Sequence, residues 1–148
     1  MTCRALLAAV AVALGALAAA AALAMAAGAA TPSRWATAAN TICAKSQKQI
    51  GDVPRAKSLE GMLKATQTVL GLVLRQNSDL AKLPRPAADA ASIATLLGYY
   101  AQETAVLKGM IAALGKNDQN AFNLQVAKGN VIDRKATALS AKLGASSC

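Results

Sequence analysis

The chain has 148 residues and a net charge of +9, with 16 Lys and Arg against seven Asp and Glu. It contains no histidine, which excludes the commonest general base and any haem-attachment motif of the C-x-x-C-H type. The basic residues are spread evenly and aromatics make up only 3% of the chain, so we expect no specific nucleic-acid partner. We interpret the charge as a solvated cationic surface, with weak association with anionic polymers or lipid headgroups as the alternative.

The first 30 residues show the three parts of a secretory signal peptide in order. Arg4 gives a basic start, residues 5–27 carry no charge, and small residues follow at 26–30. The uncharged stretch exceeds the about 7–15 residues of a usual signal core and reaches the about 20 that a membrane-spanning helix needs. Because it is mostly alanine, we favour cleavage over an uncleaved N-terminal anchor that tethers the protein through residues 5–27. Either way, we expect residues 31–148 to be extracytoplasmic: secreted, or anchored to the outer face of the cytoplasmic membrane.

Four helices are predicted in residues 31–148, from apolar residues that recur every three or four positions and from Gly and Pro between them. Their ranges are 34–50, 59–83, 87–114 and 119–143. Ser33 and Ser58 are candidate N-caps, Asn117 or Asp118 can cap the last helix, and Pro86 can sit in the first turn of the third. No stretch alternates as a strand would. Short connections favour antiparallel neighbours, so we expect an all-α, up-down-up-down four-helix bundle.

Two cysteines, Cys43 and Cys148, stay in the domain once the segment with Cys3 is removed. An even pair without a metal partner predicts a disulfide in an oxidising compartment, and two free thiols are the alternative. The bundle topology agrees with a disulfide. It brings the end of the last helix to the pole where the first helix begins, and the tail after Leu143 is long enough to fold back to Cys43.

Neither a catalytic nor a metal site is predicted. The acids form no paired-carboxylate spacing, and most lie near predicted helix ends, where capping or the helix dipole accounts for them. Glu103 and Asp133 lie in mid-helix and are expected at the surface, beside Lys or Arg partners. Because every serine lacks a base that could activate it, we expect that the protein is not an enzyme.

Polar side chains interrupt the apolar stripes of the second and third predicted helices. They are Thr66, Asn77, Tyr100 and Thr104. Hydrogen bonds that set the register between helices are the favoured interpretation, and a small polar cavity is the alternative. Haem ligation by a tyrosinate from Tyr99 or Tyr100 is a further alternative, although Tyr100 falls on a core position, and we predict no cofactor.

Short motifs follow one another along residues 35–148. Trp35 precedes Ala39-Asn-Thr-Ile-Cys43, Leu83-Pro-Arg-Pro86 separates two predicted helices, and Leu143-Gly leads to Cys148. This pattern resembles a group of small exported α-helical proteins of high-GC Gram-positive (actinobacterial) bacteria, with an A-N-x-I-C opening, an L-P-x-P hinge and a C-terminal cysteine. The resemblance implies a helical fold with a Cys43–Cys148 bridge. The group has no assigned activity, so it carries over no functional residues.

The functional expectation is an exported, non-enzymatic helical domain that binds a partner in the cell envelope or outside the cell. The alternative is a carrier that holds a small apolar ligand between its helices, as bundles can do.

Overall fold

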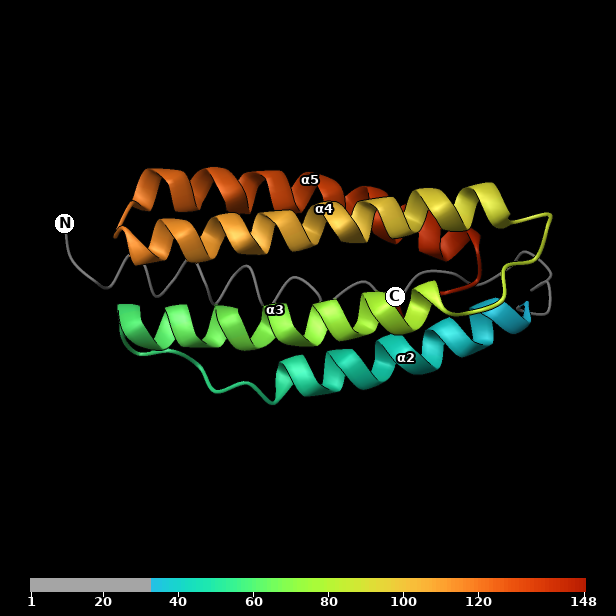
Figure 1. Ribbon diagram of the computed structural model, residues 1–148, viewed down its shortest axis with the longest axis horizontal. Helices are drawn as coiled ribbons and strands as arrows, with labels where there is room; N and C mark the ends of the chain where they lie inside the picture. Colours follow the sequence, from blue (N-terminus) through green and yellow to red (C-terminus); the bar gives the residue numbers. More distant parts are fainter. Residues whose placement is uncertain (1–32) are drawn as a thin grey trace, which may run out of the picture.

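The computed structural model describes residues 33–148; the expected signal peptide or anchor at 1–30 lies outside the described residues. Within this range there are four helices: α2 (Arg34–Gly51), α3 (Leu59–Ala81), α4 (Ala90–Gly115) and α5 (Gln119–Lys142). Residues 33–148 contain no strand. Successive helices run antiparallel along the long axis of the molecule (Figure 1). The predicted all-α bundle with its four helices is therefore confirmed.

Three of the helices begin at a residue whose side chain caps the first turn. The hydroxyls of Ser33 and Ser58 accept from the amides of Ala36 and Gly61, both at 3.1 Å, and the Asp118 carboxylate accepts from Ala121 N at 2.9 Å. Such a cap satisfies a backbone donor that has no partner within the helix, and it contributes about 1 kcal/mol. Local sequence thus fixes where α2, α3 and α5 start.

The connection between α3 and α4 is longer than the sequence predicts. The third helix starts at Ala90 instead of residue 87, because a turn in which Asp89 N donates to Pro86 O precedes it (3.1 Å). Pro86 therefore stands before the helix. The second helix ends at Ala81 instead of residue 83. Proline disfavours helical geometry in the residue before it, so Pro84 ends the helix early.

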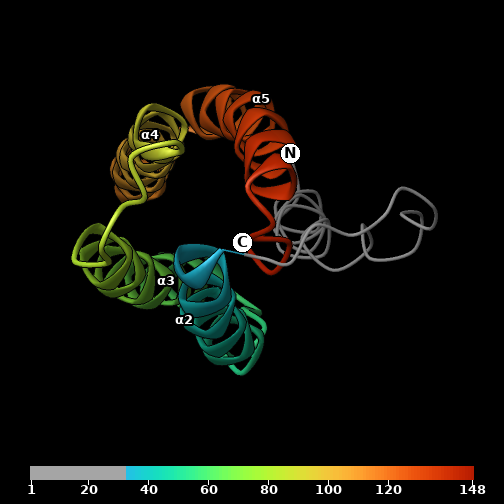
Figure 2. The same ribbon diagram turned by 90° about the vertical axis from the view of Figure 1, so that its right-hand side faces the viewer.

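Helix α4 packs against α3 on one side and against α5 on the other, and α3 also packs against α2. Figure 2 shows the helices following one another around the bundle in the order α2, α3, α4, α5. The C-terminal tail then returns from α5 toward α2. No helix within residues 33–148 is both long and apolar enough to cross a membrane.

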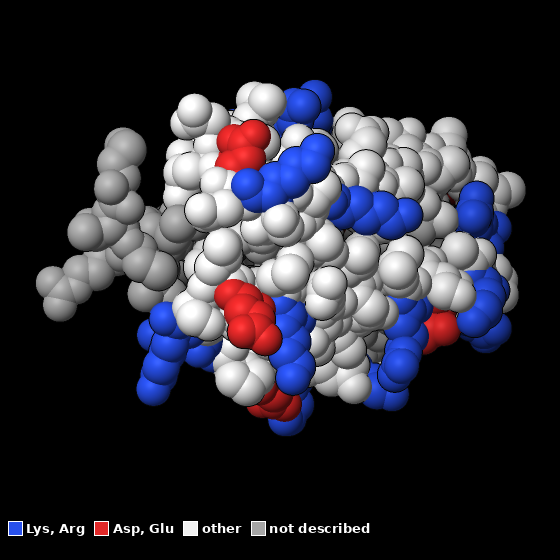
Figure 3. Space-filling model, turned by 60° about the vertical axis from the view of Figure 1, so that its left-hand side comes forward, with Lys and Arg blue, Asp and Glu red and all other residues white. Residues whose placement is uncertain are grey.

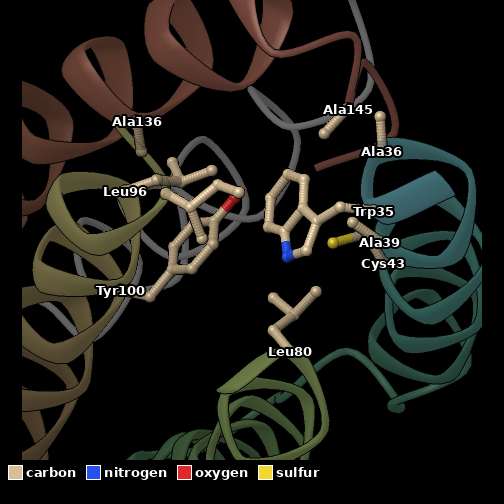
Figure 4. Close-up of a cluster of buried hydrophobic side chains, with 10 residues drawn as sticks. Trp35, Ala36, Ala39, Cys43, Leu80, Leu96, Tyr100, Ala136 and Ala145 are labelled. Atoms are coloured by element: carbon tan, nitrogen blue, oxygen red, sulfur yellow. The ribbon is translucent and has the colours of Figure 1, made fainter. Parts of the chain in front are cut away.

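The core of residues 33–148 contains two buried clusters near opposite ends of the bundle. The larger one surrounds Trp35 and takes residues from all four helices and the tail (Figure 4). Its buried members are Trp35, Ala36, Ala39, Cys43, Leu80, Ile93, Leu96, Tyr100, Ala136 and Ala145. The smaller cluster joins Met62 of α3 to Ala113 and Leu114 of α4 and Phe122 of α5. The larger cluster fixes where the tail meets α2.

Candidate functional site

The predicted disulfide joins Cys43 of α2 to Cys148, and its Cα atoms are 5.1 Å apart. Hydrogen bonds hold the tail at the same place. The amide of Asn40 donates to Gly144 O at 3.0 Å, while its Oδ1 accepts from Ser147 N at 2.8 Å. Gly144 adopts the left-handed conformation (φ 74°) that turns the chain out of α5. The cysteine pair is therefore a structural link between the two ends of the domain.

Three of the four predicted polar residues meet at the α3–α4 contact. Asn77 Nδ2 donates to the Tyr100 carbonyl at 3.2 Å and to Thr104 Oγ1 at 3.1 Å, and Thr104 Oγ1 donates to the Tyr100 carbonyl at 3.0 Å. Thr66 does not join them, since its hydroxyl donates to Met62 O one turn earlier in its own helix. The bonds of Asn77 fix one register between α3 and α4, as a register-setting role requires.

Close approaches along the α4–α5 contact define how these helices pair. A side chain at Gly109 would meet Gln125, and one at Gly129 would meet Val106. Antiparallel helices keep the sum of facing residue numbers nearly constant, so Glu103, one turn before Val106 on α4, lies at the level of residues 131–133 on α5. Asp133 is the acid at this level, and its charge acts on Glu103.

This pair of acids corrects the expectation that Glu103 and Asp133 are surface residues with basic partners. Both are half-buried, and neither forms an ion pair within residues 33–148. Burial, with a further contribution from Asp133, raises the pKa of Glu103 to about 7. Burial also raises the pKa of Asp133, which Arg134 partly offsets. A carboxyl placed against a like charge in a poorly solvated interface holds its proton to higher pH.

Tyr100 and Trp35 place polar atoms in the larger core cluster. Tyr100 is 3% exposed and Trp35 is 2% exposed, and neither the phenol oxygen nor the indole nitrogen has a hydrogen-bond partner among the described residues. Figure 4 shows the Tyr100 hydroxyl directed toward the Trp35 ring. Burial, together with the charges of Glu103 and Asp133, raises the pKa of Tyr100 well above its usual value. Tyrosinate, the form that ligates haem, is therefore disfavoured at Tyr100.

Within residues 33–148, no three His, Cys, Asp or Glu side chains come together as metal ligands would. The depression bordered by Leu59, Asn117 and Phe122 is too small to hold a water molecule. Chemically, the Glu103–Asp133 pair can bind and release a proton within a helix contact. Such proton binding makes the stability of the bundle depend on pH.

The outer surface is rich in basic side chains. Every Lys and Arg among residues 33–148 is exposed. Only two ion pairs form in this part of the chain, Lys48–Asp52 at 2.9 Å and Lys82–Asp79 at 3.3 Å. Figure 3 shows basic side chains scattered over one face between uncharged ones, with fewer acids among them. The surface is cationic because basic side chains outnumber acidic ones, and because two of the acids, Glu103 and Asp133, are half-buried.

No family model matches the chain, and neither the curated proteins nor the solved structures include a match. The resemblance to exported actinobacterial proteins stays a prediction.

The carboxyl pair was not predicted from the sequence. The carboxyl pair depends on a helix pairing that one helix's periodicity does not reveal. Gly109 and Gly129 are the signal that could have found it, since glycine in mid-helix often marks a close approach of a neighbouring element.

Proposed function

We propose that this protein is an exported, non-enzymatic helical domain that binds an anionic component of the cell envelope through its cationic surface. The observation that carries the proposal is the exposure of every basic residue from Arg34 to Lys142, with only Lys48 and Lys82 ion-paired in this range. Unpaired surface cations attract anionic partners and accelerate their association.

Export is supported by the Cys43–Cys148 disulfide, since such bonds persist in oxidising compartments. The basic N-terminal start and the uncharged residues 5–27 have the order of an export signal. Together they favour an extracytoplasmic location. Intact mass of the protein recovered from its own cells measures whether residues 1–30 are removed.

The binding experiment uses the protein as its cells export it. Anionic envelope polymer, anionic lipid vesicles and neutral vesicles are each immobilised, and bound protein is measured at about 50 and 300 mM salt. Binding to at least one anionic surface, weakened severalfold by salt, is the expected result, because exposed charges are screened beyond about 10 Å at 0.1 M salt. An absence of binding to every anionic surface contradicts the proposal, as does binding that salt leaves unchanged.

The carrier of a small apolar ligand is the alternative prediction. A native mass spectrum of the same preparation distinguishes it, since a carrier purified from its own source shows added mass.

A further inference from the structure

Helix α5 carries a line of exposed side chains that are alternately apolar and cationic. We call it the α5 strip, and it consists of Leu124, Lys128, Val131, Lys135, Ala138 and Lys142, all exposed. Its members are spaced by four and three residues alternately. At 100° per residue they fall within an arc of about 80°, and they extend over about 27 Å of helix. The strip is thus a single narrow face of α5.

The opposite face of α5 is the one that packs into the bundle. Phe122, Ala136 and Ser140 are buried, and all three lie on the far side of the helix from the strip. Asp133 lies on that inner side too, facing Glu103. Asp118, the next acid along the chain, caps the N-terminus of α5. None of the three lysines of the strip forms an ion pair within residues 33–148.

The apolar members of the strip are exposed to an unusual degree. Three large hydrophobic side chains are exposed in the described part of the chain, and two of them, Leu124 at 55% and Val131 at 44%, lie in the strip. The third, Leu74 at 45%, lies on α3. Repeated exposure of large apolar groups between lysines on one helix face is the pattern of helices that lie on an anionic membrane surface.

We propose that the α5 strip docks on the surface of an anionic lipid bilayer. Lys128, Lys135 and Lys142 contact the lipid phosphates, while Leu124 and Val131 enter the headgroup region. This inference rests on the proposed function and names its partner. A hydrated anionic polymer would satisfy the lysines and leave the two apolar side chains in water, whereas a lipid surface accommodates both kinds.

Docking of this kind is peripheral and reversible. Each basic side chain close to an anionic surface strengthens binding roughly fivefold, so three lysines account for a factor of about 100. The two apolar side chains contribute much less membrane affinity than a membrane-spanning helix does. The bundle stays folded on the membrane, because the strip contributes nothing to the buried clusters.

The first test places a fluorescent reporter in the strip and another outside it. Leu124→Trp lies in the strip, and Leu74→Trp is the matched control at a similarly exposed leucine on α3. Trp35 is buried, so its emission is a constant background in both variants. With anionic vesicles, Leu124→Trp is expected to shift to the blue by several nanometres and to be quenched by brominated acyl chains, while Leu74→Trp does neither. This readout reports local contact even if residues 5–27 stay attached.

The second test compares two variants that each lose three positive charges, one within the strip and one outside it. The triple variant Lys128→Gln, Lys135→Gln, Lys142→Gln alters the strip, and Lys45→Gln, Lys64→Gln, Lys108→Gln removes three exposed lysines elsewhere. Partition onto anionic vesicles is measured by flotation, with circular dichroism to verify folding. The strip variant is expected to lose up to about 100-fold in the partition constant, and the control less than about tenfold.

The outcomes separate this inference from the function it rests on. Equal losses in both triple variants, or equal spectral shifts at positions 124 and 74, overturn the strip and leave the cationic surface as the binding element. Binding to anionic polymer without binding to anionic vesicles also overturns the strip. If neither anionic surface is bound, both proposals fail.

Discussion

Glu103 of α4 faces Asp133 of α5 across the contact between these helices, without an ion-pair partner for either side chain among the described residues. The two carboxyl groups cannot both ionise there without repulsion, and burial already disfavours the charged form of each. A proton held by this pair therefore stabilises the bundle.

We predict that stability falls as pH rises from about 5 to about 8. The pKa of Glu103 is raised to about 7 in the folded protein, from 4.5 for an unperturbed side chain. The folded state thus binds more protons than the unfolded state in this window, and the free energy of unfolding decreases with pH. The full shift corresponds to about 3 kcal/mol. Urea unfolding at pH 5, 6, 7 and 8 measures the change.

Substitutions distinguish the contribution of Glu103 to the pH dependence of stability from that of the other acids. Glu103→Gln is expected to be more stable than the parent at pH 8 and to show a nearly flat profile between pH 5 and 8. Asp133→Asn should move the loss of stability to lower pH, because the neighbouring charge is gone. Glu60→Gln, at an exposed position in the first turn of α3, is the control and should keep the parent slope. If the stability of Glu103→Gln depends on pH as steeply as that of the parent protein, other groups are responsible for the pH dependence.

Reduction of the Cys43–Cys148 disulfide is predicted to destabilise the domain by about 2–4 kcal/mol. The bond closes a loop with a sequence separation of 105 residues, and the chain-entropy model gives about 4.7 kcal/mol for a loop of 100 residues. Thermal unfolding with and without reductant measures the effect. Reductant should leave the double variant Cys43→Ser, Cys148→Ser unchanged. A parent midpoint that reductant does not move would mean that the tail contacts alone suffice.

Asn77 is predicted to contribute more to stability than Thr66, although both interrupt the apolar stripe of the same helix. Asn77→Ala removes donors to the Tyr100 carbonyl and to Thr104 Oγ1, at a cost of about 1–2 kcal/mol. Thr66→Ala removes a bond to a carbonyl of its own helix and should cost less than about 0.5 kcal/mol. Chemical unfolding compares them. Equal costs would argue against a special role for the α3–α4 hydrogen bonds.

A double-mutant cycle tests the same contact directly. Because Asn77 and Thr104 share a bond, the cost of Asn77→Ala with Thr104→Ala should fall short of the sum of the single costs by about 0.5 kcal/mol or more. Additive costs would mean that the two side chains act independently.

The starts and ends of the helices were largely predictable because they depend on local chemistry. Ser33 and Ser58 cap the turns that follow them, whereas α3 ends at Ala81, two residues earlier than predicted. The disulfide followed from a count of two cysteines and from the bundle topology. These features require no knowledge of how one helix faces another.

The details between helices could not be predicted in the same way. Leu63 and Leu70 lie on the same stripe of α3 as Thr66 and Asn77, yet both leucines are half-buried, while Met62 and Val69, one position earlier, are buried. Helix α3 packs against both α2 and α4, so its buried face is wider than a single stripe. The Glu103–Asp133 contact likewise depends on the α4–α5 register, which periodicity within one helix does not determine.

Two glycines of α4 are predicted to respond in opposite ways to the same substitution. A Cβ at Gly98 meets nothing within 4 Å, so Gly98→Ala should stabilise the protein by about 0.5–1 kcal/mol, since alanine is the better helix former. A Cβ at Gly109 comes within 2.7 Å of the Gln125 side chain. Gly109→Ala must therefore displace Gln125 from the α4–α5 contact, and the helix-propensity gain is reduced or lost.

Urea unfolding of both variants beside the parent protein measures the difference. Adding Gln125→Ala to Gly109→Ala provides the control, since it removes the side chain in the way and should restore the gain of about 0.5–1 kcal/mol. Equal stabilisation by Gly98→Ala and Gly109→Ala would mean that the Gln125 side chain moves away from position 109 without a loss of folding free energy. In that case the α4–α5 register, and with it the pairing of Glu103 and Asp133, would have to rest on contacts other than this close approach.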